Sequence, residues 1–256
     1  MRKGAFNRIN IAGLAVIAMW IVLWEVYTRT VGSRFDSIAS STAIIITIKD
    51  LLCNGPLPAQ FCHTTSIALA GWIIASTVGF AIGLAIGMSN LAWTYSMASF
   101  DVLRSIPSIS FVPIAVLWFG FSLTTELVIV VYVAVWPVLL GTLNSVHSVP
   151  AGLLEVSRIF HLSKASTLFK ITLPAALPSV LVSLRLSLTL SIALAVVAEM
   201  IGNPEGLGYG MVFAQQAVQP AQAFGYLVVI GVLGWAFNTL FVLISRRLAR
   251  GYENPI

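Results

Sequence analysis

Charged side chains are scarce in this sequence: they make up 9% of its 256 residues, whereas 58% are hydrophobic and the mean hydropathy is +0.95. A soluble domain usually carries roughly a quarter charged residues. So few charges cannot cover the surface of a water-soluble globule of this length, and the surplus of apolar side chains must face lipid. We therefore predict that residues 1–256 form one membrane domain, with no room for a second folded domain.

Patterns typical of other functions are also missing. The phosphate-binding motif Gly-x-x-x-x-Gly-Lys-Ser/Thr does not occur, which excludes ATP hydrolysis by that route. His63, His147 and His161 lie far apart in different loops, and no carboxylate pair or nucleophile–base pair is expected to converge. We therefore predict no metal site and no catalytic residue. The net charge is +5, but the basic residues form no basic face, which argues against a nucleic-acid partner.

Alternation of apolar and polar residues with a period of two is absent as well, so the membrane-crossing segments are predicted to be helices. A crossing helix takes about 20 apolar residues. The sequence offers six candidates, at 9–27, 64–88, 106–121, 127–146, 178–198 and 223–244. The first candidate lacks the small-residue cleavage site of a signal peptide, so we interpret it as a retained membrane span. The third is short and carries Pro107 and Pro113, so we expect it to be kinked or extended by its flanks.

The distribution of basic residues predicts the orientation. With the N-terminus in the cytoplasm, six spans return the C-terminus to the same side. Of the 14 basic residues, 11 then fall on the inner side, and the three on the outer side are Arg29, Arg34 and Lys49. An excess of positive charge on the cytoplasmic side is the rule for multi-pass membrane proteins. Adding or removing one predicted span would remove this excess. The prediction is an all-α protein with both termini in the cytoplasm.

Cysteine is limited to Cys53 and Cys62, which flank Asn54-Gly55-Pro56 in the predicted outer loop 28–63. An oxidising periplasm would permit a disulfide across this turn. Two unpaired, partly buried thiols are the alternative, and the residues alone do not decide between them. The apolar stretch 44–52 in the same loop is too short to span the membrane and is expected to lie in its interface.

The second span carries a small residue at every fourth position. These residues are Gly71, Ala75, Gly79, Gly83 and Gly87. Such a stripe lets another helix approach closely, because little side chain separates the backbones. The partner is either a helix of a second copy or, as in most helix contacts of a six-span bundle, a helix of the same chain.

The predicted cytoplasmic loop 147–176, between the fourth and fifth spans, mixes basic and apolar residues. Two short helices are expected, at about 151–160 and from Ser163 to about Lys170, with Ser163 as N-cap. An amphipathic loop of this kind either lies on the membrane surface or docks into a groove of a partner protein.

At this loop the chain resembles the permease subunits of binding-protein-dependent ABC importers, whose pattern is Glu-Ala-Ala-x3-Gly-x9-Ile-x-Leu-Pro. Glu155, Ile171, Leu173 and Pro174 match at the required spacing. The departures are Val156 and Ser157 for the alanines and His161 for the glycine, which suits a sharp turn at positive φ. The resemblance implies that the loop couples the chain to an ATP-binding subunit. The residues assigned to this coupling are Glu155, Val156, Ser157, Arg158, His161, Ile171, Leu173 and Pro174.

The resemblance covers roughly residues 60 to 250. The segments that look like the nitrate, sulfonate and taurine branch are Arg104-Ser-Ile-Pro107, Leu117-Trp-Phe-Gly120, Pro174-Ala-Ala-Leu-Pro178 and Ala198-Glu-Met-Ile-Gly202. It implies a type I importer permease in the bacterial inner membrane, acting by alternating access on a small organic or inorganic anion. The implied partners are a second copy, two ATP-binding cassette subunits that hold ATP and Mg, and a periplasmic solute-binding protein. No cofactor is expected on this chain itself. An ion-gradient-driven transporter or channel that works without an ATPase is the alternative.

Four polar positions in the fifth span have competing interpretations. Ser183 and Ser187 would line a pathway or bond to the preceding helical turn. Arg185 would contact substrate or, since it lies about two turns from the inner end, extend to the interface. Glu199 would form an outer gate or receive the binding protein, or it would be a solvated carboxylate at the end of the span.

Overall fold

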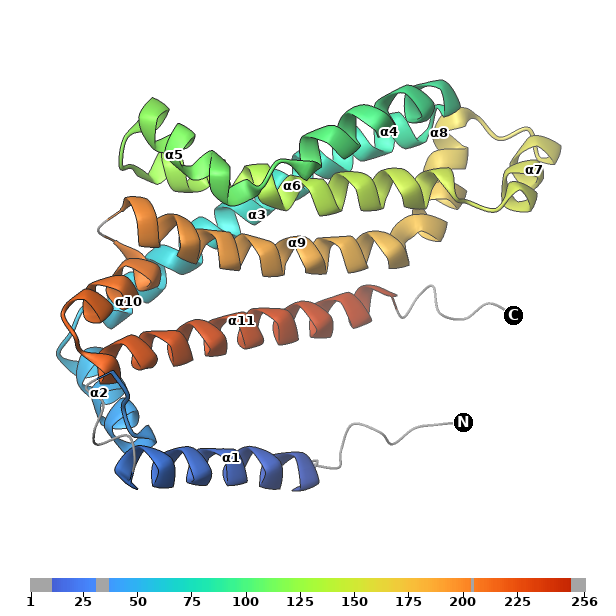
Figure 1. The fold of residues 1–256 in the computed structure, drawn as a ribbon. Helices are drawn as coiled ribbons and strands as arrows, with labels where there is room; N and C mark the ends of the chain where they lie inside the picture. The colour runs from blue at the N-terminus through green and yellow to red at the C-terminus, as the bar shows by residue number, and fades with distance from the viewer. Residues whose placement is uncertain (1–10, 31–36, 204, 250–256) are drawn as a thin grey trace. The chain divides into compact units, whose positions relative to one another are not determined.

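The computed structural model describes residues 11–30, 37–203 and 205–249, and this part of the chain is helical and contains no strand (Figure 1). The chain divides into two compact units. The first consists of residues 1–58 and 210–229, and the second of residues 59–209 and 230–256. The all-α fold predicted from composition is confirmed.

In the first unit, α1 (Ile11–Thr30) is followed by α2 (Ser41–Cys53). The Glu25 carboxylate joins the two helices, because it accepts hydrogen bonds from Arg29 Nε at 2.7 Å and from the Thr42 backbone N–H at 3.2 Å. Helix α2 occupies the apolar stretch of the predicted outer loop, and its isoleucines Ile45 and Ile46 are exposed, as expected of an interfacial helix.

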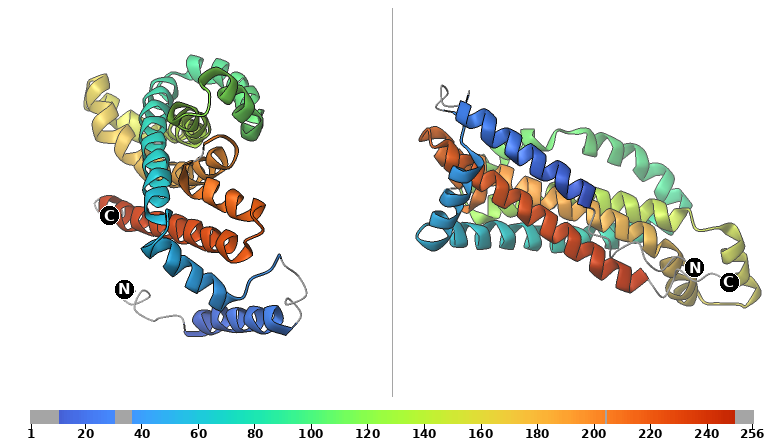
Figure 2. Two further views of the ribbon diagram at one scale, coloured as in Figure 1. Left: turned by 90° about the vertical axis from the view of Figure 1, so that its left-hand side faces the viewer. Right: turned by 90° about the horizontal axis from the view of Figure 1, so that it is seen from below.

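The remaining helices follow in chain order. They are α3 (Leu57–Gly87), α4 (Asn90–Ser105), α5 (Ser108–Phe119), α6 (Leu123–His147), α7 (Ala151–Ile159), α8 (Lys164–Thr167), a π-helical turn (Leu168–Thr172), α9 (Leu173–Gly202), α10 (Gly206–Gln216) and α11 (Pro220–Ala249). Within the second unit, α3 and α9 both pack on α6 (Figures 1 and 2).

Helix α6 forms the core of the second unit, and its small-residue partner is α3 of the same chain. A Cβ atom on Gly71 would meet the Val130 side chain, and one on Gly87 would lie 2.9 Å from the Leu143 carbonyl oxygen. The stripe therefore brings two helices of one chain together. Of the two interpretations, the structure supports packing against a helix of the same chain.

Four helical segments are long and apolar enough to cross a membrane: Leu57–Gly87, Leu123–His147, Lys164–Ile201 and Pro220–Arg247. They coincide with the second, fourth, fifth and sixth predicted spans. Helix α1 lies at the place of the first predicted span, whose residues 9 and 10 fall outside the described residues. Its apolar side chains are largely exposed, as lipid-facing side chains would be.

The third predicted span, 106–121, differs from the structure. Helix α4 ends at Ser105, residues 106 and 107 are extended, and α5 leaves at an angle of 83° to α4. The break follows from Pro107, because proline disfavours helical backbone at the residue before it. Helix α5 is 12 residues long, about 18 Å, too short to cross alone. Within the described residues, α4 and α5 reach the length and apolar composition of a fifth span when they are taken together as one bent pair.

Candidate functional site

The loop between α6 and α9 forms the two short helices that its sequence predicts. Helix α7 runs from Ala151 to Ile159, directly after Pro150, whose fixed φ suits a helix start. Ser163 caps α8 as predicted, because its hydroxyl oxygen accepts a hydrogen bond from the Ser166 backbone N–H at 3.2 Å. In Figure 1, α7 stands beyond the ends of α6 and α9.

The turn between α7 and α8 has the left-handed conformation that a glycine would suit. His161 has a φ of 48°. The Leu162 N–H donates to the Ser157 carbonyl at 2.9 Å, and the His161 N–H donates to the Arg158 carbonyl at 3.0 Å. This pair of bonds is a Schellman motif, which satisfies the last carbonyls of α7. The sharp turn is thus kept although histidine replaces the family's glycine.

The second half of the loop continues into a span. Helix α8, the π-helical turn and α9 form a continuous helical run from Lys164 to Ile201. Ile171 and Leu173 are half-buried at the junction, and Pro174 stands in the first turn of α9, where its missing N–H removes no helical bond. A force on α8 would therefore be transmitted directly to α9.

The outer face of this loop exposes apolar side chains next to charged ones. Ile159, Phe160 and Phe169 are 73%, 71% and 68% exposed. Glu155 and Arg158, on the same short helix as Ile159, are exposed too. Grouped exposed apolar side chains with a charged rim are typical of a protein–protein contact.

The polar residues proposed to line a pathway each form a hydrogen bond with a different partner. The Ser183 hydroxyl donates to the Ser179 carbonyl in its own helix, whereas Ser187 is fully buried and donates to the Ala134 carbonyl of α6 at 2.6 Å. Arg185 Nε donates to Asn238 Oδ1 on α11 at 2.7 Å, beside a groove of about 710 Å³. The cysteines Cys53 and Cys62 are free and exposed.

Glu199 is not a solvated end carboxylate; this part of the prediction was wrong. It is 1% exposed, and its Oε2 accepts hydrogen bonds from Thr64 Oγ1 at 3.0 Å and from the Gly208 N–H at 2.9 Å. Gly206, with a φ of 94°, lies against the Glu199 carboxylate so closely that a Cβ would meet it at 2.2 Å. The chain that follows α9 thus folds back over this side chain.

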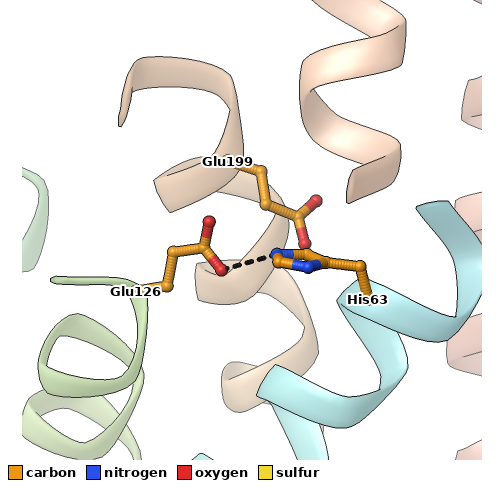
Figure 3. Close-up of side chains that lie close together, drawn as sticks. All are labelled: His63, Glu126 and Glu199. Carbon is orange, nitrogen blue, oxygen red and sulfur yellow. Dashed lines mark hydrogen bonds and ion pairs between the residues drawn. The ribbon is translucent and has the colours of Figure 1, made fainter. Parts of the chain in front are cut away.

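A second carboxylate and an imidazole lie beside Glu199 (Figure 3). Ligand atoms of His63, Glu126 and Glu199 all lie within 4.8 Å of one another. Glu126, also 1% exposed, contacts His63 Nε2 through Oε2 at 2.9 Å and accepts a hydrogen bond from Asn203 Nδ2 through Oε1 at 2.6 Å. The group joins the start of α3, the start of α6 and the end of α9, so these three ends lie together.

The sequence interpretation missed this cluster, because it sought residues close in sequence or within one loop. The expectation that no carboxylate pair converges in any loop did not cover pairs from different segments, and Glu126 and Glu199 come from α6 and α9. A usable signal was present: by the predicted topology, His63, Glu126 and Glu199 all stand at the outer ends of spans. Ionisable residues at span ends on one side of the membrane become neighbours when those helices pack together.

The fold defines a multi-pass helical membrane protein. Its loop 147–176 exposes apolar and charged side chains, as surfaces that bind other proteins do. The chain belongs to the family described as binding-protein-dependent transport system inner membrane component, whose model matches residues 58–254. It is therefore a transport permease of the inner membrane.

Relatives of the chain agree with this assignment. It is 29% identical to a putative aliphatic sulfonates transport permease protein, SsuC, of Bacillus subtilis over 93% of this chain and 86% of the relative. It is 28% identical to the nitrate import permease protein NrtB of Synechocystis over 90% and 86%. A bicarbonate transport system permease protein, CmpB, of Synechococcus elongatus is 26% identical over 64% and 62%.

Solved structures share the fold. An inward-facing structure of the MetNI methionine ABC transporter matches with a TM-score of 0.63 at 18% identity, over 84% of this chain and all of that chain. An amino acid ABC transporter crystallised with histidines matches with a TM-score of 0.63 at 14% identity, over 83% and 99%. The type I importer permease fold predicted from the motifs is confirmed.

Proposed function

We propose that loop 147–176 docks into a separate ATP-binding subunit, and that this contact drives solute import through the membrane helices. The observation that carries the proposal is that the apolar side chains of Ile159, Phe160 and Phe169 are all exposed on a loop continuous with α9. Burying such side chains in a partner groove removes them from water, and charged neighbours such as Glu155 set the orientation.

In this mechanism the permease performs no chemistry. ATP and Mg are held by the partner subunits, because this chain has no phosphate-binding motif. Closure of those subunits would push on α7 and α8, and the continuous run Lys164–Ile201 would move α9 with them. A second copy of the chain is proposed to complete the pathway, because the helices of the second unit pack on α6, whose side chains are largely buried within one chain.

The transported solute is proposed to be a small organic or inorganic anion. The support is the names of the relatives, which concern aliphatic sulfonates, nitrate and bicarbonate, all of them anions. A periplasmic solute-binding protein delivers the solute and supplies most of the selectivity. Binding assays on that protein with sulfonates, nitrate and bicarbonate would identify the anion.

The coupling proposal is tested by purifying the chain together with the products of its neighbouring genes and measuring whether an ATPase co-purifies. Glu155→Arg reverses an exposed charge on α7 and is expected to release the ATPase. Asp50→Arg reverses an exposed charge on α2, in the predicted outer segment 28–63, and serves as the matched control. Solute uptake that persists without any ATPase would refute the proposal and favour a gradient-driven transporter or channel.

A further inference from the structure

The cluster of His63, Glu126 and Glu199 holds two carboxylates in an almost fully buried place. Burial of a carboxylate is costly unless positive charge or hydrogen bonds compensate for it. The ion pairs described for this cluster come from His63, and neither lysine nor arginine takes part in them. One imidazole cannot neutralise two ionised carboxylates, and the other donors of the cluster, on Thr64, Gly208 and Asn203, are neutral.

The two ring nitrogens of His63 both face carboxylates. Nε2 lies 2.9 Å from Glu126 Oε2, and Nδ1 lies 3.1 Å from Glu205 Oε2. A neutral imidazole has one N–H and can satisfy only one of these two acceptors. The other contact is made by a second proton on the ring, by the proton of a neutral carboxyl group, or by a cation shared between the nitrogen and the carboxylate. Metal-bound histidines commonly donate the remaining N–H to a carboxylate, as Nδ1 would to Glu205.

An independent sign of a missing ligand is Glu199 Oε1. This oxygen is buried and has no hydrogen-bond partner, although the residue is 1% exposed and its carboxylate reaches toward His63 (Figure 3). An unpaired buried acceptor of this kind is uncommon, because leaving it unpaired forfeits its solvation. Hydrogen bonds around the cluster therefore leave one buried carboxylate oxygen of Glu199 without a donor.

We propose that His63, Glu126 and Glu199 bind one divalent transition-metal cation of the Zn²⁺ type. Imidazole with carboxylates is a donor set that such cations prefer, and the two carboxylates neutralise its charge. His63 is 12% exposed and Glu205 is 64% exposed, so an ion can enter from the surface. The bound ion ties together the ends of α3, α6 and α9.

The test uses the full chain in detergent, purified without a histidine tag and carrying Cys53→Ser and Cys62→Ser, because free thiols also bind Zn²⁺. After removal of metal with EDTA, Zn²⁺ is titrated against a competing chromophoric chelator. The expected result is one Zn²⁺ per chain. His63→Gln, Glu126→Gln and Glu199→Gln are each expected to weaken binding by at least about tenfold, and Glu205→Gln by about tenfold. His147→Gln, on the far end of α6, is the control and should bind as the parent does.

A second measurement does not depend on the folding of these variants. Zn²⁺ at about 100 times its Kd should raise the unfolding midpoint of the parent chain by about 5 °C or more relative to EDTA, whereas the same concentration of Mg²⁺ should not. Equal midpoints in Zn²⁺ and EDTA would overturn the proposal and leave a protonated His63 as the counterion. Zn²⁺ binding that His63→Gln and Glu199→Gln leave unchanged would overturn it as well. Neither measurement relies on transport or on the ATPase.

Discussion

Gly83 on α3 lies so close to α6 that a Cβ atom on it would be 2.5 Å from the carbonyl oxygen of Leu139. At this point the two helix backbones are in contact. Gly83→Ala should therefore force α3 and α6 apart and lower the free energy of unfolding by about 1–3 kcal/mol. Unfolding of the detergent-solubilised chain by heat or denaturant measures the change.

Gly231→Ala is the matched control, since a Cβ on Gly231 of α11 would meet nothing within 4 Å. Alanine also favours the helix over glycine by roughly 0.5–1 kcal/mol. This variant should be as stable as the parent or slightly more so. Equal losses from both substitutions would show that α3 and α6 are not packed as described.

Thr64 connects Glu199 to the chain beyond α9. Its buried hydroxyl donates to Glu199 Oε2 and accepts from the Leu207 N–H at 2.9 Å. Thr64→Val keeps the shape but leaves both partners without this bond, which should lower the free energy of unfolding by about 1–3 kcal/mol. Thr77→Val removes only an exposed bond to the Ile73 carbonyl, and the same measurement should show a change of less than about 0.5 kcal/mol.

The left-handed turn at His161 predicts a stabilising substitution. His161→Gly removes the side chain that disfavours a φ of 48° and should raise the free energy of unfolding by about 1 kcal/mol. Phe160, the preceding residue, has an ordinary φ of −83°, so Phe160→Gly should give no such gain. Thermal unfolding of both variants distinguishes them, and a loss of stability in His161→Gly would contradict the turn geometry.

The exposed aromatic side chains of loop 147–176 should contribute to binding of the ATPase rather than to the stability of the chain. Phe160→Ser is expected to reduce co-purification of the ATPase, while the free energy of unfolding of the isolated chain changes by less than about 0.5 kcal/mol. Phe121→Ser alters an equally exposed phenylalanine just before α6, on the predicted outer side, and should leave the ATPase bound. Release of the ATPase by both variants would indicate a nonspecific effect.

Much of the fold follows from local properties of the chain. Long apolar runs have to be helical in lipid, so five of the six predicted spans coincide with single helices at their place. The Ser163 cap and the turn at position 161 follow from short-range hydrogen bonding, which a few neighbouring residues decide. The kink or extension expected of the third span, 106–121, is found as the break before Pro107, across which α4 and α5 together reach the required length.

The sequence by itself determined the membrane helices and the shape of loop 147–176, since both depend on residues close together in the chain. The tertiary structure alone decided that the glycines of α3 face α6 and that Glu199 is buried beside Glu126 and His63. Those relationships join residues more than 50 positions apart. They depend on which ends of which helices pack together, and no local pattern specifies that choice.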